Sequence, residues 1–247
     1  MRISIKNIPI KRETIALMVF FVLAGSACKK KETSAYDKGE DYYPLKSGAY
    51  IVYEVDSTWY DDFSQDTLQQ LYQLKERCDT LFETAEGKTA MRIERFKRAQ
   101  PGDNWGTPRI YWAYTENSYA IRAEENLLYV KLQFPVKKGT TWNSNRFNFK
   151  PSEDFRFEKV DADTTLNGIL FGPAAFVHSR ASYESKIDKY RQMEVYARNI
   201  GLIYREYIKI DSVYRDKVGS DTNNLPVMNK IKKGYVYRQT ALEWGEE

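Results

Sequence analysis

The chain has 247 residues, a formal net charge of +4 and an aromatic content of 15%. Four basic residues and one acidic residue lie within residues 1–27, so the 220 residues that follow carry a net charge of only +1. A nearly neutral domain lacks the basic surface that nucleic acids require, and we expect no nucleic-acid partner. The length suits one domain, since all-β barrels and sandwiches commonly have about 200–250 residues.

The first feature along the chain is a secretory leader. The run Ile15–Gly25 is continuously apolar but shorter than the roughly 20 residues of a membrane-spanning helix. Basic residues precede it, and Ser26 and Ala27 follow it directly before Cys28. A basic segment, a short apolar core and small residues at the cleavage site are typical of a signal peptide. We therefore predict that residues 1–27 are a signal peptide.

Cys28 resembles the acylated cysteine in the lipobox of bacterial lipoproteins. Ser26 and Ala27 fit that pattern, whereas Gly25 stands where Leu, Val or Ile is usual. The resemblance implies cleavage before Cys28 and lipidation of its sulfur, and several acyl chains would make membrane attachment stable. The alternative is an ordinary signal-peptidase site, which would release a soluble secreted protein.

Residues 28–41 are polar and without periodicity, which predicts a lipidated cysteine followed by a flexible tether. In lipoprotein families, Asp directly after the acylated cysteine favours retention at the inner membrane, and Lys29 occupies that place here. An acidic cluster after the cysteine marks export to the cell surface in Bacteroidota, and only Glu32 fits it. We expect a lipid anchor in the outer membrane, on the periplasmic face.

The remaining residues, 42–247, predict one β-rich domain. Nineteen Tyr, twelve Phe and five Trp residues favour strands. Ile51, Tyr53 and Val55 alternate with more polar residues, as in a half-buried strand. The fold class we expect is mainly β: a single antiparallel curved sheet, or an open barrel or sandwich, with long hairpins and at most one or two short helices. The predicted strands are 51–56, 68–82, 89–97, 110–115, 119–124, 147–149 and 155–160, followed by a strand, turn and strand within 194–206 whose turn is Asn199–Gly201. The segment Ile169–Ser179 is apolar, and Val227–Trp244 closes the domain with Tyr235 and Tyr237 alternating.

Between these strands, Glu86–Lys88, Asn167–Gly168 and Asn199–Gly201 carry turn signals. Tyr183–Gln192 is highly charged, which suits a short helix or a mobile loop. Tyr214–Leu225 is a polar loop candidate.

One pattern occurs twice. Tyr43–Tyr50 and Phe134–Trp142 share the order aromatic, Pro, aliphatic, Lys, any residue, Gly, with another aromatic two or three residues later. Pro restricts one backbone angle and Gly allows a left-handed one, so both segments predict turns that lead into strands. Gly48 and Gly139 are then expected to have positive φ. A partner-binding lip is the alternative.

If Cys28 is acylated, Cys78 remains without an internal disulfide partner. It has the same parity as Tyr72, Leu74 and Phe82 in an alternating segment. A buried structural thiol is the preferred interpretation, ahead of a reactive nucleophile.

Residues 42–57, 132–145 and 195–208 look like blocks of a group of uncharacterised Bacteroidota lipoproteins, in the same order. The resemblance covers most of the mature chain and implies no catalytic residue. A lipidated N-terminus followed by one antiparallel sheet is also similar in architecture to the open-barrel lipoprotein carriers of Gram-negative bacteria, although a fold does not fix a function.

Catalytic motifs are absent from the sequence. His178 is the one histidine, and Ser179 beside it would point to the opposite face of a strand, so a Ser–His site is not expected. A multi-histidine zinc site and a Gly-rich phosphate loop are excluded. We expect a protein that is not an enzyme and that needs no cofactor and no metal.

Two functions fit these observations. The first is a non-enzymatic envelope lipoprotein whose β-domain has a structural role or binds an apolar or protein partner. The second is a glycan-binding module that uses exposed tryptophans to stack on sugars, with Trp59, Trp105, Trp112 and Trp142 as candidates. Trp105 lies in the turn-rich segment 101–107 and is the most favourable of the four, whereas core packing is the alternative for all of them.

Overall fold

A computed structural model describes residues 36–64, 66–185, 188–213 and 231–247. Residues Asp37–Glu247 form one compact unit. Among the described residues of this unit, the one helical element is the 3₁₀ turn η1 (Glu40–Tyr42). No helix in the described ranges is long and apolar enough to cross a membrane. The predicted leader, Cys28 and the polar loop at residues 214–225 lie outside these ranges.

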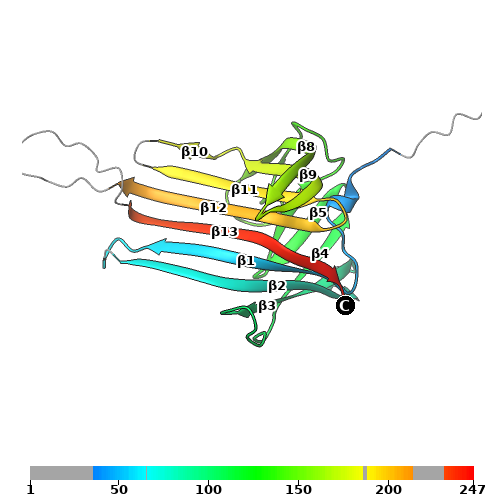
Figure 1. Cartoon of the computed structure of the whole chain (residues 1–247). Coiled ribbons are helices and arrows are strands. Elements are labelled where there is room, and N and C mark those ends of the chain that lie inside the picture. Colours follow the sequence, from blue (N-terminus) through cyan, green and yellow to red (C-terminus); the bar gives the residue numbers. More distant parts are fainter. Residues whose placement is uncertain (1–35, 65, 186–187, 214–230) are drawn as a thin grey trace, which may run out of the picture. The chain divides into compact units, whose positions relative to one another are not determined.

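Thirteen strands form one antiparallel sheet (Figure 1). Twelve of them follow the order β6-β5-β4-β3-β2-β1-β13-β12-β11-β9-β8-β7, and β10 pairs with β11 on the side. The strands are β1 (Ala49–Tyr60), β2 (Thr67–Glu83), β3 (Thr89–Arg98), β4 (Arg109–Glu116), β5 (Tyr119–Glu124), β6 (Leu127–Gln133), β7 (Thr141–Asn143), β8 (Asp154–Leu166), β9 (Ile169–Ser179), β10 (Tyr183–Glu184), β11 (Lys189–Ala197), β12 (Gly201–Val213) and β13 (Ile231–Glu246). The predicted mainly β fold class is confirmed.

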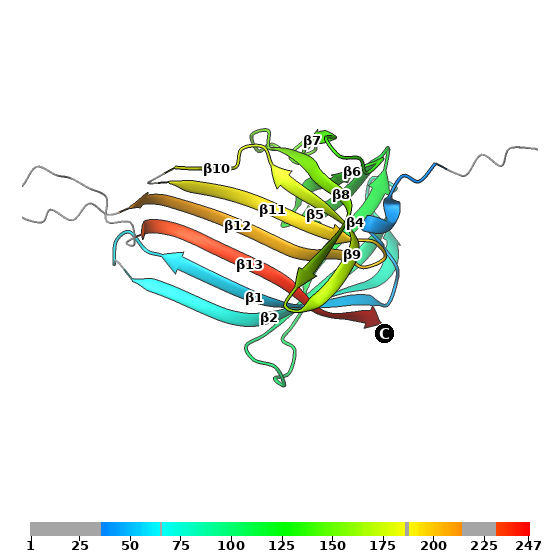
Figure 2. The same ribbon diagram turned by 45° about the horizontal axis from the view of Figure 1, so that its top comes forward.

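The sheet curls so that its two edge strands, β6 and β7, approach each other (Figure 2). The seam between them is not a full ladder. The Val130 amide donates to the Ser144 carbonyl at 2.9 Å, and Asn148 Nδ2 donates to the Leu128 carbonyl at 2.8 Å. The sheet is therefore an almost closed barrel with one weakly joined seam.

Strands β1, β2, β11, β12 and β13 extend beyond the others at one end of the barrel, so this end is open on one side (Figures 1 and 2). At the other end, the Asn199 amide donates to the Asp41 carbonyl at 2.8 Å, which holds η1 against the β11–β12 turn. A buried cluster fills this closed end, made of Tyr42, Val130, Leu132, Phe134, Trp142, Phe155, Phe157 and Tyr196 with smaller neighbours.

The strand register defines an inner face. Tyr72, Val55, Gln239, Arg205 and Glu194 lie side by side on five successive strands, from β2 to β11. Directly paired residues of antiparallel strands point to the same side of a sheet. Residues two positions along each strand share that side, because side chains alternate. The inner face thus carries charged and aromatic side chains as well as aliphatic ones.

Most predicted strands are confirmed, including 68–82 and 89–97, which differ from β2 and β3 by at most one residue at each end. The paired turns are confirmed as well. Gly48 has φ +84° and Gly139 has φ +87°. The Ala49 amide donates to the Lys46 carbonyl, and Thr140 donates to Lys137 in the same way. Positive φ at the third residue of such a turn favours Gly.

Three expectations are wrong. Residues 147–149 form turns and bends, because this segment wraps over the seam instead of pairing. The described part of Tyr183–Gln192 is not helical: it forms β10 and the start of β11. Cys78 and Phe82 do not share a face, because a bulge in β2 between Cys78 and Leu81 reverses the alternation. Phe82 packs on Trp112 instead.

Candidate functional site

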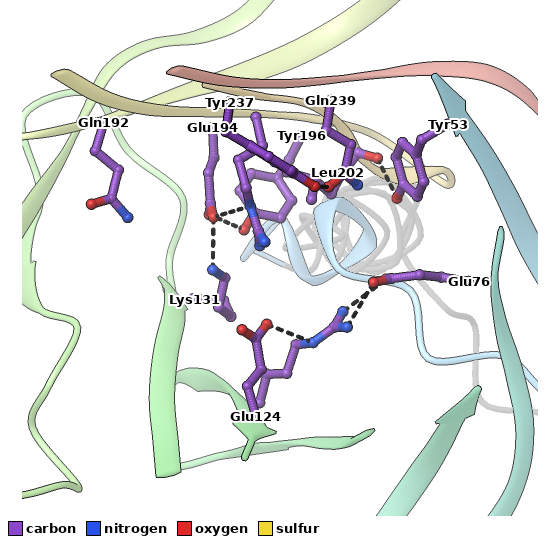
Figure 3. Close-up of polar contacts among 12 residues, drawn as sticks. Tyr53, Glu76, Glu124, Lys131, Gln192, Glu194, Tyr196, Leu202, Tyr237 and Gln239 are labelled. Atoms are coloured by element: carbon purple, nitrogen blue, oxygen red, sulfur yellow. Dashed lines mark hydrogen bonds and ion pairs between the residues drawn. The ribbon is translucent and has the colours of Figure 1, made fainter. Parts of the chain in front are cut away.

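Two clusters of buried charge lie inside the barrel (Figure 3). In the first, Arg122 on β5 donates two hydrogen bonds to Glu76 on β2, at 2.9 and 2.8 Å. Arg95 on β3 donates from Nε to the same carboxylate at 2.7 Å. Glu124 Oε1 lies 2.9 Å from Arg122 Nε. One carboxylate thus joins three strands of one wall.

The second cluster joins the facing walls. Lys131 on β6 contacts Glu194 on β11 at 2.7 Å between Nζ and Oε1. Arg205 on β12 lies 2.9 Å from the same oxygen, and the Tyr196 hydroxyl donates to the other one. The Glu194 side chain is only 4% exposed. Buried ions require such pairing, because an isolated charge in a protein interior is costly.

The carboxylates of both clusters are ionised at neutral pH. Burial by itself would raise the pKa of Glu194, but Lys131 and Arg205 outweigh it and lower the pKa to about 2. Burial opposes ionisation of Glu124 in the same way, and Arg122 lowers its pKa to about 2. The Lys131 pKa is lowered because burial outweighs the attraction of Glu194. The carboxylates therefore present fixed negative charges to the barrel interior.

A first hollow of about 440 Å³ adjoins the second cluster. Lys131, Glu194 and Arg205 form part of its lining, and Tyr190, Tyr207 and Tyr237 form another part. Burial raises the pKa of Tyr190, as does its hydrogen bond to Glu153 (2.6 Å), so its hydroxyl keeps its proton. The first hollow combines polar groups with aromatic faces.

A second hollow of about 370 Å³ shares Arg205 and Tyr237 with the first. Four cations line it, namely Arg95, Lys97, Arg109 and Arg205, and its lining contains no carboxylate. Lys97 Nζ lies 3.7 Å from the centre of the Tyr72 ring, which stabilises a cation without neutralising it. Arg95 and Arg205 are paired with Glu76 and Glu194, so the net positive charge of the second hollow comes from Lys97 and Arg109.

An aromatic row crosses the open end of the inner face. We give this name to Trp59, Tyr235, Tyr207, Tyr190 and Tyr183, which come from β1, β13, β12, β11 and β10. Consecutive ring centroids are 5.8, 6.2, 5.9 and 6.4 Å apart. The register pairs Trp59 with Tyr235 and Tyr183 with Tyr190. Their rings consequently share one face of the sheet.

The four predicted tryptophans do not come together. Trp59 is 54% exposed and belongs to the aromatic row. Trp105 is partly covered by the Arg98 guanidinium, 4.2 Å from its ring. Trp112 stacks on Tyr114 (5.8 Å between centroids) and contacts Phe82, on the outer face.

The expectation that Trp142 is exposed is wrong. The residue is 4% exposed because its ring packs on Phe155 and Phe157, and its Nε1 donates to the Val130 carbonyl at 3.2 Å. Cys28 lies outside the described residues, so its predicted lipidation stays a prediction.

The tyrosines and buried charges of the inner face were not expected. Tyr235 and Tyr237 do stand out in the sequence by their period of two. Glu194 and Arg205 carry no comparable signal, because charged residues that alternate with apolar ones are typical of a solvent-facing side. In this barrel the charged side of the strand faces the interior, not the solvent.

The remaining candidates do not form a reactive centre. His178 and Ser179 pair with different neighbours on β8 and project to opposite faces, as expected. Cys78 is a partly buried free thiol, and burial raises its pKa to about 11, which suits the predicted structural thiol. No group of three His, Cys, Asp or Glu side chains in the described ranges is arranged to hold a metal ion.

Comparisons with known proteins give two weak similarities of fold. No family model matches the chain, and no curated protein matches it. A protein of Bacteroides fragilis, described as exported and of YmcC-like fold, has a TM-score of 0.43 and 10% identity. A protein of Parabacteroides distasonis, described as a lipoprotein, has a TM-score of 0.40 and 12% identity. Each match covers 83% of this chain and 98% of the other.

Proposed function

We propose that this protein is a non-enzymatic binding protein of the bacterial cell envelope, and that its inner face takes a polar, negatively charged ligand. The charge of the second hollow carries the proposal. Its four cations face a concave space with no carboxylate in the lining. A concave region of one sign of charge attracts ligands of the opposite sign, because its low-dielectric walls concentrate the field.

The carboxylates of the two buried clusters do not neutralise all the cations that line the hollows. Together they contain four cations and three carboxylates. Lys97 and Arg109 form no ion pair with any residue that the structure describes. Both side chains are exposed, so an incoming anion would meet two cations that no described carboxylate neutralises.

An apolar ligand, one of the partners that the sequence analysis left open, fits this space less well. A lipid chain in the first hollow would cover Lys131, Glu194 and Arg205 without replacing the hydration that they lose. Such desolvation is costly for charged groups. The charged lining of the first hollow therefore argues against a lipid chain there, and the anion is assigned to the second hollow, whose lining has no carboxylate.

The location follows from the N-terminal segment. Residues 1–27 have the pattern of a signal peptide, and Cys28 that of a lipidated cysteine. A lipid on Cys28 would attach the domain to a membrane, and Lys29 favours the outer membrane over the inner one by the lipoprotein sorting pattern. We propose the periplasmic face of that membrane.

The test uses anilinonaphthalene sulfonate, an aromatic anion that fluoresces in a partly apolar site. The mature chain, residues 28–247 with Cys28→Ala, should bind it saturably. Arg109→Gln should weaken binding about tenfold, as expected for one charge-assisted hydrogen bond. Thr107→Trp, which would fill the second hollow, should weaken it further.

The matched control is Lys138→Gln. Lys138 is an exposed cation on the turn before β7 and is not part of either lining. Its removal changes the net charge as Arg109→Gln does and should leave the affinity unchanged. Absence of saturable binding, or an equal effect of the two charge variants, would contradict the proposal.

A further inference from the structure

The aromatic row is not a packed core. Trp59 is 54% exposed and Tyr183 is 56% exposed, and the three tyrosines between them are half-buried. Rings that only stabilised the fold would lie behind other side chains, as Trp142 does. The row is therefore partly accessible to solvent at the open end of the barrel, with Trp59 and Tyr183 as its two exposed rings.

The aromatic row runs across the strands, nearly perpendicular to them. It crosses four gaps between neighbouring strands, from β1 to β10, and therefore extends over roughly 19 Å at the usual strand spacing. The residue that directly pairs with Tyr235 on β12 is Lys209, and Tyr207 from the next position bridges that gap. An extended ligand is required to contact all five rings.

Charge lies directly beside the row. The Tyr235 ring stacks on Tyr237 at 6.3 Å, and Tyr237 lines both hollows together with Arg205. A ligand on the row that continues into the second hollow would meet Arg205, then Lys97 and Arg109. Guanidinium groups bind carboxylates in a bidentate manner, with hydrogen bonds stronger than those of neutral donors.

We propose that the ligand is an acidic glycan, whose sugar rings stack on the aromatic row and whose carboxylate groups bind the cations of the second hollow. This inference rests on the proposed function and names its ligand class. Aromatic side chains with a polar edge, such as Tyr and Trp, suit a surface that is apolar and hydrated at once. The cations then select acidic chains over neutral ones.

Calorimetry with two probes tests the inference on the mature Cys28→Ala chain: an oligosaccharide of polygalacturonate and a neutral cello-oligosaccharide of equal length. The acidic probe should bind, and more weakly as salt is raised. Tyr207→Ala should weaken binding about tenfold, near the upper limit for one aromatic contact. Arg109→Gln should reduce the preference for the acidic probe.

Two further variants complete the design. Trp59→Ala removes the most accessible ring of the inner strands and should weaken binding without loss of stability, since that ring is 54% exposed. Tyr114→Ala disrupts the stacked pair with Trp112 on the outer face and should leave binding unchanged. These two variants separate loss of a contact from loss of fold, which thermal melts check in each case.

The outcomes distinguish the inference from the proposed function. If anilinonaphthalene sulfonate binds but the acidic oligosaccharide does not, the glycan inference is overturned and an anionic ligand of another class remains. Equal affinity for the neutral oligosaccharide would also overturn it. If neither the dye nor either oligosaccharide binds, the proposed function fails with it.

Discussion

Gly48 and Gly139 have the same backbone conformation but differ in how closely other atoms surround them. A Cβ atom on Gly48 would lie 2.6 Å from the carbonyl oxygen of Glu247, whereas a Cβ atom on Gly139 would meet nothing within 4 Å. Gly48→Val should therefore reduce the free energy of unfolding by about 3 kcal/mol, and Gly139→Val by about 1 kcal/mol, the range for a strained backbone position.

Urea unfolding of the two variants measures this difference. Pro44→Ala and Pro135→Ala serve as controls in the same turns, and each should cost less, because their effect is largely on the unfolded chain. Near-native stability of both glycine variants would show that the paired turns serve a partner and not the fold.

The Glu76 carboxylate pairs with both Arg95 and Arg122, so neutralising it should strongly reduce the free energy of unfolding. Glu76→Gln would leave Arg95 and Arg122 buried with reduced compensation, and the loss of one partner from a buried ion pair typically costs about 3–5 kcal/mol. The measurement is again the free energy of unfolding in urea. Glu86→Gln, at an exposed turn position, is the matched control and should change stability little. A small effect at Glu76 would mean that water replaces the lost charge.

At the scale of single strands, the alternation of residues predicted the strands whose apolar positions face one side. Ile51, Tyr53 and Val55 do share a face in β1. The prediction failed at the bulge in β2, because one local irregularity reverses every later side chain. No residue type in the segment from Cys78 to Leu81 marks a bulge.

The site was less predictable than the strands. Hydrophobic periodicity identifies an inner face only where the interior is apolar, and here Glu194 and Arg205 occupy inner positions. The candidate tryptophans were chosen for ring size alone, and only Trp59 lies beside the tyrosines of the aromatic row. The five rings of that row come from five different strands and become neighbours only through the pairing of strands.

At the scale of the whole molecule, acid should destabilise the fold. Glu124 and Glu194 each have a pKa near 2 in the folded protein, against an ordinary value of 4.5. The unfolded chain binds more protons between these values, so stability is constant above about pH 5 and falls as the pH decreases from 4.5 toward 2. Urea midpoints across this range test the direction. Glu194→Gln should be less stable at neutral pH and should show a weaker dependence on pH.

Attachment to the membrane belongs to the whole chain as well. If Cys28 carries lipid, Cys28→Ala should move the protein from the membrane fraction to the soluble fraction, or block its processing. Fractionation followed by mass spectrometry of the N-terminus measures both effects. Unchanged membrane retention with normal cleavage would refute the predicted lipid anchor.

The closure of the sheet could not be predicted, because it depends on pairing between distant segments. Neighbouring hairpins follow from turn signals such as Asn167–Gly168, which does connect β8 and β9. The pairing of β1 with β13 joins the two ends of the compact unit. No local pattern in either strand specifies the other.

The Arg198 side chain fixes the N-terminal end of the described chain to the closed end of the barrel. It binds Asp41 at 2.8 Å and Asp37 at 2.9 Å, so residues within the predicted tether are fastened to the closed end. Trp59 lies at the other end of β1, ten residues from Ala49, which corresponds to roughly 33 Å of strand. If Cys28 carries lipid, the closed end is the end joined to the tether, and we expect the barrel mouth to face away from the bilayer. Brominated lipids should then fail to quench Trp59 fluorescence, in a chain whose other four tryptophans are replaced by Phe, whereas strong quenching would show the opposite orientation.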